Sequence, residues 1–114
     1  MERGLVKTTT HTMKERLYKI IRNKKVIGQY TLFSGKGWVY VWCFIIDEPH
    51  RNKGVGTEIL LRLTKRYKRV YICPSNKNSE RLYARLGTAI SRNKCQKELV
   101  SVFDEIGKMY LICG

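Results

Sequence analysis

Two closely spaced glycines, Gly54 and Gly56, lie where an apolar run gives way to an amphipathic helical pattern. The first N–H groups of a helix have no partner within the helix and carry partial positive charge. Glycine lacks the side chain that would keep an anion away from such groups. A strand, a glycine-rich turn and a helix in this order therefore predict a phosphate or pyrophosphate site, which begins at Arg51 and ends at Thr57.

Two well-known phosphate motifs do not describe this turn. The P-loop pattern G-x-x-x-x-G-K-[ST] is absent from the sequence, and the dinucleotide-binding pattern needs a third glycine where Ile59 stands. The pattern that remains is [QR]-x-x-G-x-[GA], directly after an apolar run. A helix start with a glycine-rich turn and no ligand explains the same residues, so this motif alone leaves both interpretations open.

A second motif lies further along the chain. Asn76 precedes Tyr83 by seven residues, and a Leu-Gly pair follows Tyr83 after two further residues. In this order and spacing, the two motifs resemble the GNAT superfamily of acetyltransferases over residues 39–88. Two positions depart from the usual pattern of that family: Thr88 stands where an aromatic residue is frequent, and Pro49 is displaced by one residue.

The resemblance implies an N-acetyltransferase that moves an acetyl group directly from acetyl-CoA to an amine acceptor. Tyr83 would be the general acid, because a phenol with an ordinary pKa of about 10 keeps its proton at neutral pH. Without the resemblance, Tyr83 would be an ordinary helix aromatic. No carboxylate lies in the run 38–46, so no general base is assigned. The resemblance assigns the binding of acetyl-CoA to Phe44, Ile45, Ile46, Arg51, Asn52, Lys53, Gly54, Val55, Gly56, Thr57 and Asn76.

Hydrophobic periodicity predicts the elements that hold these residues. The uncharged run 38–46 predicts a central strand buried on both faces, and the crossover from it to the next strand should be parallel. Expected strands cover residues 17–22, 26–33, 38–46, 70–73, 89–91 and 109–113. Expected helices cover residues 54–67 and a segment from Asn78 or Ser79 to Gly87, with 96–106 either helical or irregular.

The order of these elements predicts an α/β fold, a GNAT-like mixed β-sheet flanked by helices with a truncated N-terminal part. Residues 1–12 are expected to form a tail or an edge segment. The 114 residues fit one domain, residues 1–114, and 43% hydrophobic residues argue against global disorder. No apolar run approaches about 20 residues and no signal-peptide pattern occurs, so a cytoplasmic protein without a membrane partner is expected.

Four cysteines lie far apart without a C-x-x-C pair, and only two histidines are present. Cys43 and Cys73 fall within predicted strands. Reduced thiols that pack as small hydrophobic groups are therefore the expected form, and no set of metal ligands is predicted.

The net charge of +14, from 23 basic and 9 acidic residues, suits a polyanionic partner. A solvated surface, attraction of the CoA phosphates and a nucleic-acid partner are three alternative explanations of this charge. The alternative to an enzyme is thus a basic nucleic-acid-binding module without catalysis, and a hybrid is an acetyltransferase whose acceptor is associated with nucleic acid. The type of amine-bearing substrate and the oligomeric state are open, a homodimer included. The basic residues expected to serve a polyanion are Arg62, Lys65, Arg66, Lys68 and Arg69, with Lys24 and Lys25 as a second patch.

Overall fold

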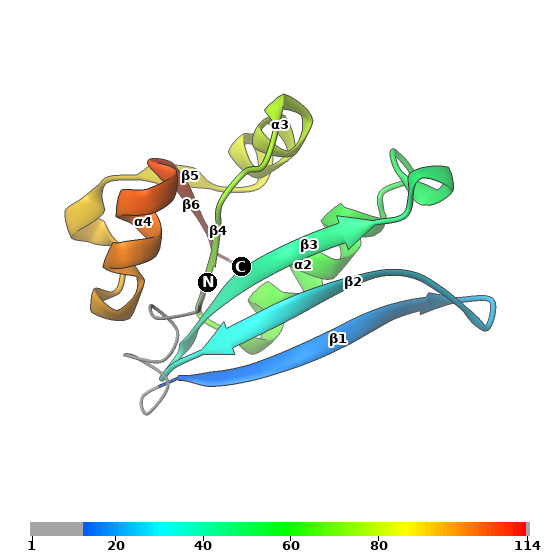
Figure 1. Cartoon of the computed structure of the whole chain (residues 1–114), viewed down its shortest axis with the longest axis horizontal. Helices are drawn as coiled ribbons and strands as arrows, with labels where there is room; N and C mark the ends of the chain where they lie inside the picture. Colours follow the sequence, from blue (N-terminus) through cyan, green and yellow to red (C-terminus); the bar gives the residue numbers. More distant parts are fainter. Residues whose placement is uncertain (1–12, 114) are drawn as a thin grey trace.

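Six strands form one mixed sheet in the order β1-β2-β3-β4-β6-β5, flanked by helices (Figure 1), which confirms the predicted fold class. The computed structural model describes residues 13–113, so the predicted tail or edge segment over 1–12 lies outside the described residues. The strands are β1 (Lys14–Arg22), β2 (Lys25–Ser34), β3 (Trp38–Ile46), β4 (Arg69–Ile72), β5 (Thr88–Ile90) and β6 (Met109–Ile112). The helices are α2 (Val55–Arg66), α3 (Lys77–Leu86) and α4 (Val100–Ile106), with the 3-10 turns η1 (Glu48–His50), η2 (Arg92–Lys94) and η3 (Lys97–Leu99).

The N-terminal part of the described chain is a hairpin. Its two strands, β1 and β2, are the only elements before β3 within the described residues. Asn23 and Lys24 connect them with left-handed φ angles of 51° and 65°. Two consecutive left-handed residues give a turn whose twist matches that of paired strands, so β1 and β2 form a tight antiparallel hairpin.

β3 and β4 run parallel, as predicted, and separate part of the way along β3. Their pairing extends from Trp38 with Arg69 to Val41 with Ile72. β3 then continues to Ile46, still paired with β2 but with no described strand on its other edge. The backbone groups on that edge are therefore free to meet a ligand.

Alternate residues of β3 build two separate cores on the two faces of the sheet. Val39 and Val41 belong to the core that also contains the buried residues of α2 and α3. Trp38 and Tyr40, only 5% and 4% exposed, belong to the other core, which α4 borders and which includes Met109. This alternation holds over the first half of β3, where the strand pairs with β4.

The second half of β3 contradicts the prediction of a strand buried on both faces, since Trp42 is 41% and Ile45 is 48% exposed. These residues lie beyond the end of the pairing with β4, so they lose its cover. Cys43 has a left-handed φ of 52°, where two residues of β3 lie opposite one residue of β2. This bulge reverses the alternation, and Phe44 and Ile46 therefore pack on the α2 and α3 side of the sheet.

Smaller differences concern the thiols and the C-terminal region. The cysteines are free thiols, but Cys43 and Cys113 are exposed, which contradicts their expected packing as small hydrophobic groups. Residues 96–106, predicted as either helical or irregular, form η3 and α4. In the part of the chain that the structure covers, no helix is long and apolar enough to span a membrane.

Candidate active site

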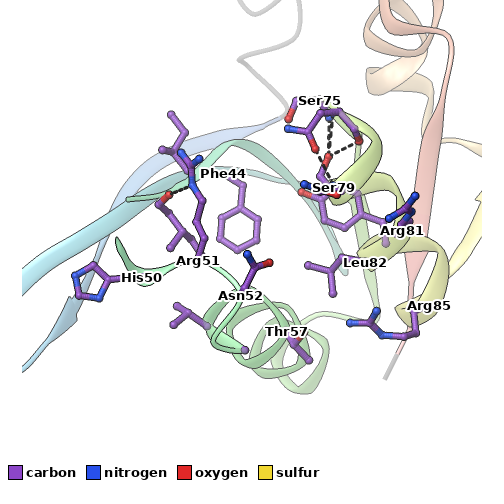
Figure 2. Close-up of a pocket in the computed structure, with 18 residues that line it drawn as sticks. Phe44, His50, Arg51, Asn52, Thr57, Ser75, Ser79, Arg81, Leu82 and Arg85 are labelled. Carbon is purple, nitrogen blue, oxygen red and sulfur yellow. Dashed lines mark hydrogen bonds between the residues drawn. The ribbon is translucent and has the colours of Figure 1, made fainter. Parts of the chain in front are cut away.

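A pocket of about 640 Å³ opens beyond the point where β3 separates from β4, and α2 and α3 border it (Figure 2). Every predicted site residue except Lys53 lines this pocket. Lys53 is exposed and lies outside the lining. The lining residues that the motifs did not indicate are His50, Ser75, Asn78, Ser79, Arg81, Leu82 and Arg85.

The N-terminus of α2 has no side-chain cap. Its N-cap residue is Gly54, and the first helical hydrogen bond runs from the N–H of Glu58 to the carbonyl of Gly54 at 3.0 Å. The N–H groups of Val55, Gly56 and Thr57 therefore precede the helical hydrogen bonds, and these residues line the pocket. Together with the positive end of the helix dipole, they form a position suited to an anion.

Both glycines leave room for a ligand at this helix start. A Cβ atom at Gly56 would lie 3.5 Å from Cδ2 of Leu82 and 3.7 Å from Cδ1 of Ile46, which are ordinary contact distances. A Cβ atom at Gly54 would meet no atom within 4 Å, so this side of the turn is open, and the φ of 81° favours glycine there. The exposed backbone of the turn thus fits a phosphate group, and a long acidic side chain at either glycine would occupy the same space.

The open edge of β3 directs polar backbone groups at the pocket. The N–H of Asp47 donates to the carbonyl of Ile27 in β2 at 2.8 Å, so the N–H and carbonyl of Ile46 point away from β2, toward the pocket. The Ile46 carbonyl accepts a hydrogen bond from Nε of Arg51 at 2.7 Å. The N–H of Ile46 is left for a ligand, and Phe44, two residues earlier, presents its backbone on the same side.

In contrast to α2, α3 begins with a complete cap. Oδ1 of Asn76 accepts a hydrogen bond from the N–H of Ser79 at 2.9 Å, and Oγ of Ser79 accepts one from the N–H of Asn76 at 3.1 Å. The helix therefore begins earlier than the predicted start at Asn78 or Ser79, because the reciprocal pair makes Asn76 the N-cap residue. Asn76 lines the pocket, but the helix already uses its side-chain oxygen.

Tyr83 lines the pocket from α3 and is 5% exposed. Burial raises the pKa of its hydroxyl to about 12, and the nearby thiol of Cys73 adds to this effect. The Tyr83 ring packs edge-on against Tyr110, with the ring centroids 6.4 Å apart. Among the described residues, none forms a hydrogen bond with the Tyr83 hydroxyl, and Tyr83 is one of the residues that line the pocket.

The pocket is basic, because cationic side chains line it and no carboxylate does within the described residues. Its cationic or titratable lining residues, apart from Tyr83, are His50, Arg51, Arg81 and Arg85. The remaining polar side chains are neutral hydroxyl and amide groups. The arrangement suits a polyphosphate ligand and leaves no carboxylate to act as a general base.

A mixed sheet that opens beside a basic, glycine-rich helix start is suited to hold a cofactor that carries phosphate groups. The chain belongs to the acetyltransferase (GNAT) family, whose family model matches residues 6–88. Enzymes of this family use acetyl-CoA, so the resemblance seen in the two motifs and the cofactor that it implies are confirmed. No curated protein sequence matches the chain significantly.

Solved structures share this fold at low sequence identity. An acetyltransferase of the GNAT family from Staphylococcus aureus Mu50 has a TM-score of 0.66 at 16% identity, over 98% of this chain and 79% of that chain. A GNAT family acetyltransferase from Elizabethkingia anophelis with acetyl-CoA bound has a TM-score of 0.54 at 17% identity, over 97% and 81%. N-acetylglutamate synthase from Neisseria gonorrhoeae, complexed with coenzyme A and N-acetyl-glutamate, has a TM-score of 0.67 at 11% identity, and this chain covers only 28% of it.

Proposed function

We propose that this protein is an N-acetyltransferase, which transfers the acetyl group of acetyl-CoA directly to an amine with Tyr83 as the general acid. The observation that carries the proposal is the uncapped start of α2, which faces a pocket lined by arginines and by no described carboxylate. Membership of the acetyltransferase (GNAT) family supports the class of reaction. The amine acceptor draws support from the bound N-acetyl-glutamate of one protein with a similar fold.

Different residues around the pocket would bind different parts of the cofactor. The N–H groups of Val55, Gly56 and Thr57 would hold the pyrophosphate, with Arg51 adding charge. The open edge of β3 at Phe44 and Ile46 would pair with the amide groups of the pantetheine arm, as a peptide strand pairs with a sheet edge. Acetyl-CoA, when bound, would supply the acetyl group as a thioester.

Tyr83 is suited to remain protonated and then donate its proton to the thiolate that leaves. Its pKa of about 12 keeps the hydroxyl protonated at neutral pH, and the residue lines the pocket. A thiolate in the same buried position would also be a stronger base than in water, because burial penalises the charged form of both groups. Since no described carboxylate lines the pocket, the acceptor amine would lose its proton to water or arrive neutral.

Calorimetry and product analysis test the proposal together. Acetyl-CoA and CoA should bind, and incubation of acetyl-CoA with a panel of amines and alcohols should release free thiol and give an acetylated amine by mass spectrometry. Acetylation of hydroxyl groups alone would refute the amine acceptor but keep the family activity. Binding of a polynucleotide with no binding of acetyl-CoA would instead favour the basic nucleic-acid-binding module.

A further inference from the structure

Two arginines on α3, Arg81 and Arg85, line the pocket at a helical spacing that puts them on one side of the helix. Figure 2 shows both on the α3 side, with Arg85 extending toward the part of α2 that contains Thr57. Neither arginine forms an ion pair with an acidic residue of the described chain. Their charge is therefore available to the pocket.

The acidic residues of the two bordering helices do not neutralise these arginines. α2 and α3 each contain a single acid, Glu58 and Glu80. Glu58 accepts hydrogen bonds from Arg22 at 2.8 Å and from Arg62 at 2.7 Å. Glu80 accepts hydrogen bonds from Lys108 and from the hydroxyl of Tyr110. Each carboxylate is thus bound outside the pocket, which leaves the field inside it positive.

The pocket consequently has two positions for anionic groups, one on each bordering helix. The first is the uncapped start of α2, and the second is the pair Arg81 and Arg85 on α3. A ligand with a single pyrophosphate would need only the first. CoA carries a further phosphate, on the 3′ position of its ribose, and dephospho-CoA lacks it.

We propose that Arg81 and Arg85 bind the 3′-phosphate of CoA and make the protein selective for CoA over dephospho-CoA. The proposal rests on the proposed binding of acetyl-CoA in this pocket. Guanidinium groups suit the role, because their planar N–H donors match phosphate oxygens in pairs. Both side chains are exposed, so the attraction should be partly screened and should weaken as salt rises.

Calorimetry with CoA and dephospho-CoA on four forms of the protein tests this role. The forms are the wild type, Arg81→Gln, Arg85→Gln and the control Arg16→Gln, which removes an exposed arginine of β1 outside the pocket lining. The wild type should bind CoA roughly tenfold more tightly than dephospho-CoA at low salt. Each pocket variant should lose about threefold to tenfold in CoA affinity and keep its affinity for dephospho-CoA within about twofold. The control should match the wild type.

The outcomes separate this inference from the proposed function. Equal binding of CoA and dephospho-CoA by the wild type would overturn the selectivity while acetyl-CoA binding stands. An equal loss for both ligands in the pocket variants would mean that the arginines contact another part of the ligand, and this too would overturn the inference. No binding of either ligand would overturn the proposed function, and the inference with it.

Discussion

Nε of Arg51 donates a hydrogen bond of 2.7 Å to the carbonyl oxygen of Ile46. The bond joins the loop that leads into α2 to the end of β3, across the turn η1. The two parts of the site that it connects are the open edge of β3 and the uncapped helix start. We therefore propose that Arg51 positions the pyrophosphate site relative to the pantetheine site, in addition to supplying charge.

Substitution of Arg51 should separate these two roles. Arg51→Gln removes the charge and should weaken acetyl-CoA binding about tenfold, or ~1.4 kcal/mol. Arg51→Lys keeps the charge but not the planar donor geometry, and should weaken binding about threefold. Calorimetry measures both, with Arg16→Gln as the control for the loss of one positive charge. If Arg51→Lys binds as well as the wild type, only the charge matters and the positioning role is wrong.

Gly56 offers a matched pair of substitutions at the helix start. Gly56→Ala should retain acetyl-CoA binding within about threefold, because the added methyl group meets only ordinary contacts. Gly56→Glu should lose more than about 100-fold, since a carboxylate beside a phosphate costs several kcal/mol. Calorimetry measures binding, and circular dichroism checks that both variants fold. Similar binding by the two variants would place the phosphates elsewhere. Gly54→Glu should lose binding as well, with added strain from the left-handed backbone.

The sequence could predict the turn and most of the pocket because local signals define them. Gly54 and Gly56 follow a strand and precede a periodic apolar stripe, and both signals lie within a short stretch of chain. The bulge at Cys43 has no such signal, because it depends on how β2 pairs with β3. It reverses the alternation of the strand, and the prediction of burial on both faces failed beyond that point.

The basic character of the pocket could not be predicted from net charge. It depends on where Glu58 and Glu80 point, and each of them binds one cation that lies far away in sequence, Arg22 and Lys108 respectively. Arg81 and Arg85 carry one local signal, their spacing of four residues, but this spacing is equally typical of a solvated helix face. Only the folded arrangement of α3 beside α2 places both arginines at the pocket.

Glu80 links α3 to β6 and should make stability depend on pH. The hydrogen bond from Lys108 lowers the pKa of Glu80 below its ordinary value of 4.5, with a smaller contribution from Tyr110. A lowered folded pKa means that the stabilisation is present above the unfolded pKa and is lost as pH falls through the folded pKa. Glu80→Gln should therefore lower the midpoint of thermal unfolding at pH 7 but not at strongly acidic pH. Glu15→Gln, at an exposed position of β1, is the control, and a constant difference at all pH values would contradict the linkage.

Tyr83→Phe tests the general acid, with Tyr110→Phe as a matched control. The ring of Tyr83 keeps its packing in the variant and its hydroxyl binds no described residue, so affinity for acetyl-CoA should change by less than about twofold. Turnover should fall about 10²–10⁴-fold, because the proton donor is lost. Tyr110 touches the same ring, but its hydroxyl donates to Glu80 outside the pocket, so Tyr110→Phe should keep its turnover.

The pH profile of the wild type gives an independent test of Tyr83. Activity that needs the protonated hydroxyl persists below its folded pKa and is lost above it, and burial raises that pKa to about 12. Turnover with acetyl-CoA saturating should therefore show no decline from loss of this proton up to about pH 10, the ordinary pKa of a phenol. Wild-type turnover could instead fall near neutral pH, with no such fall in Tyr83→Phe. That result would mean that Tyr83 loses its proton far more easily than its burial allows. Equal turnover of Tyr83→Phe and wild type, with chemistry rate-limiting, would leave Tyr83 as a packing residue and require another source for the proton.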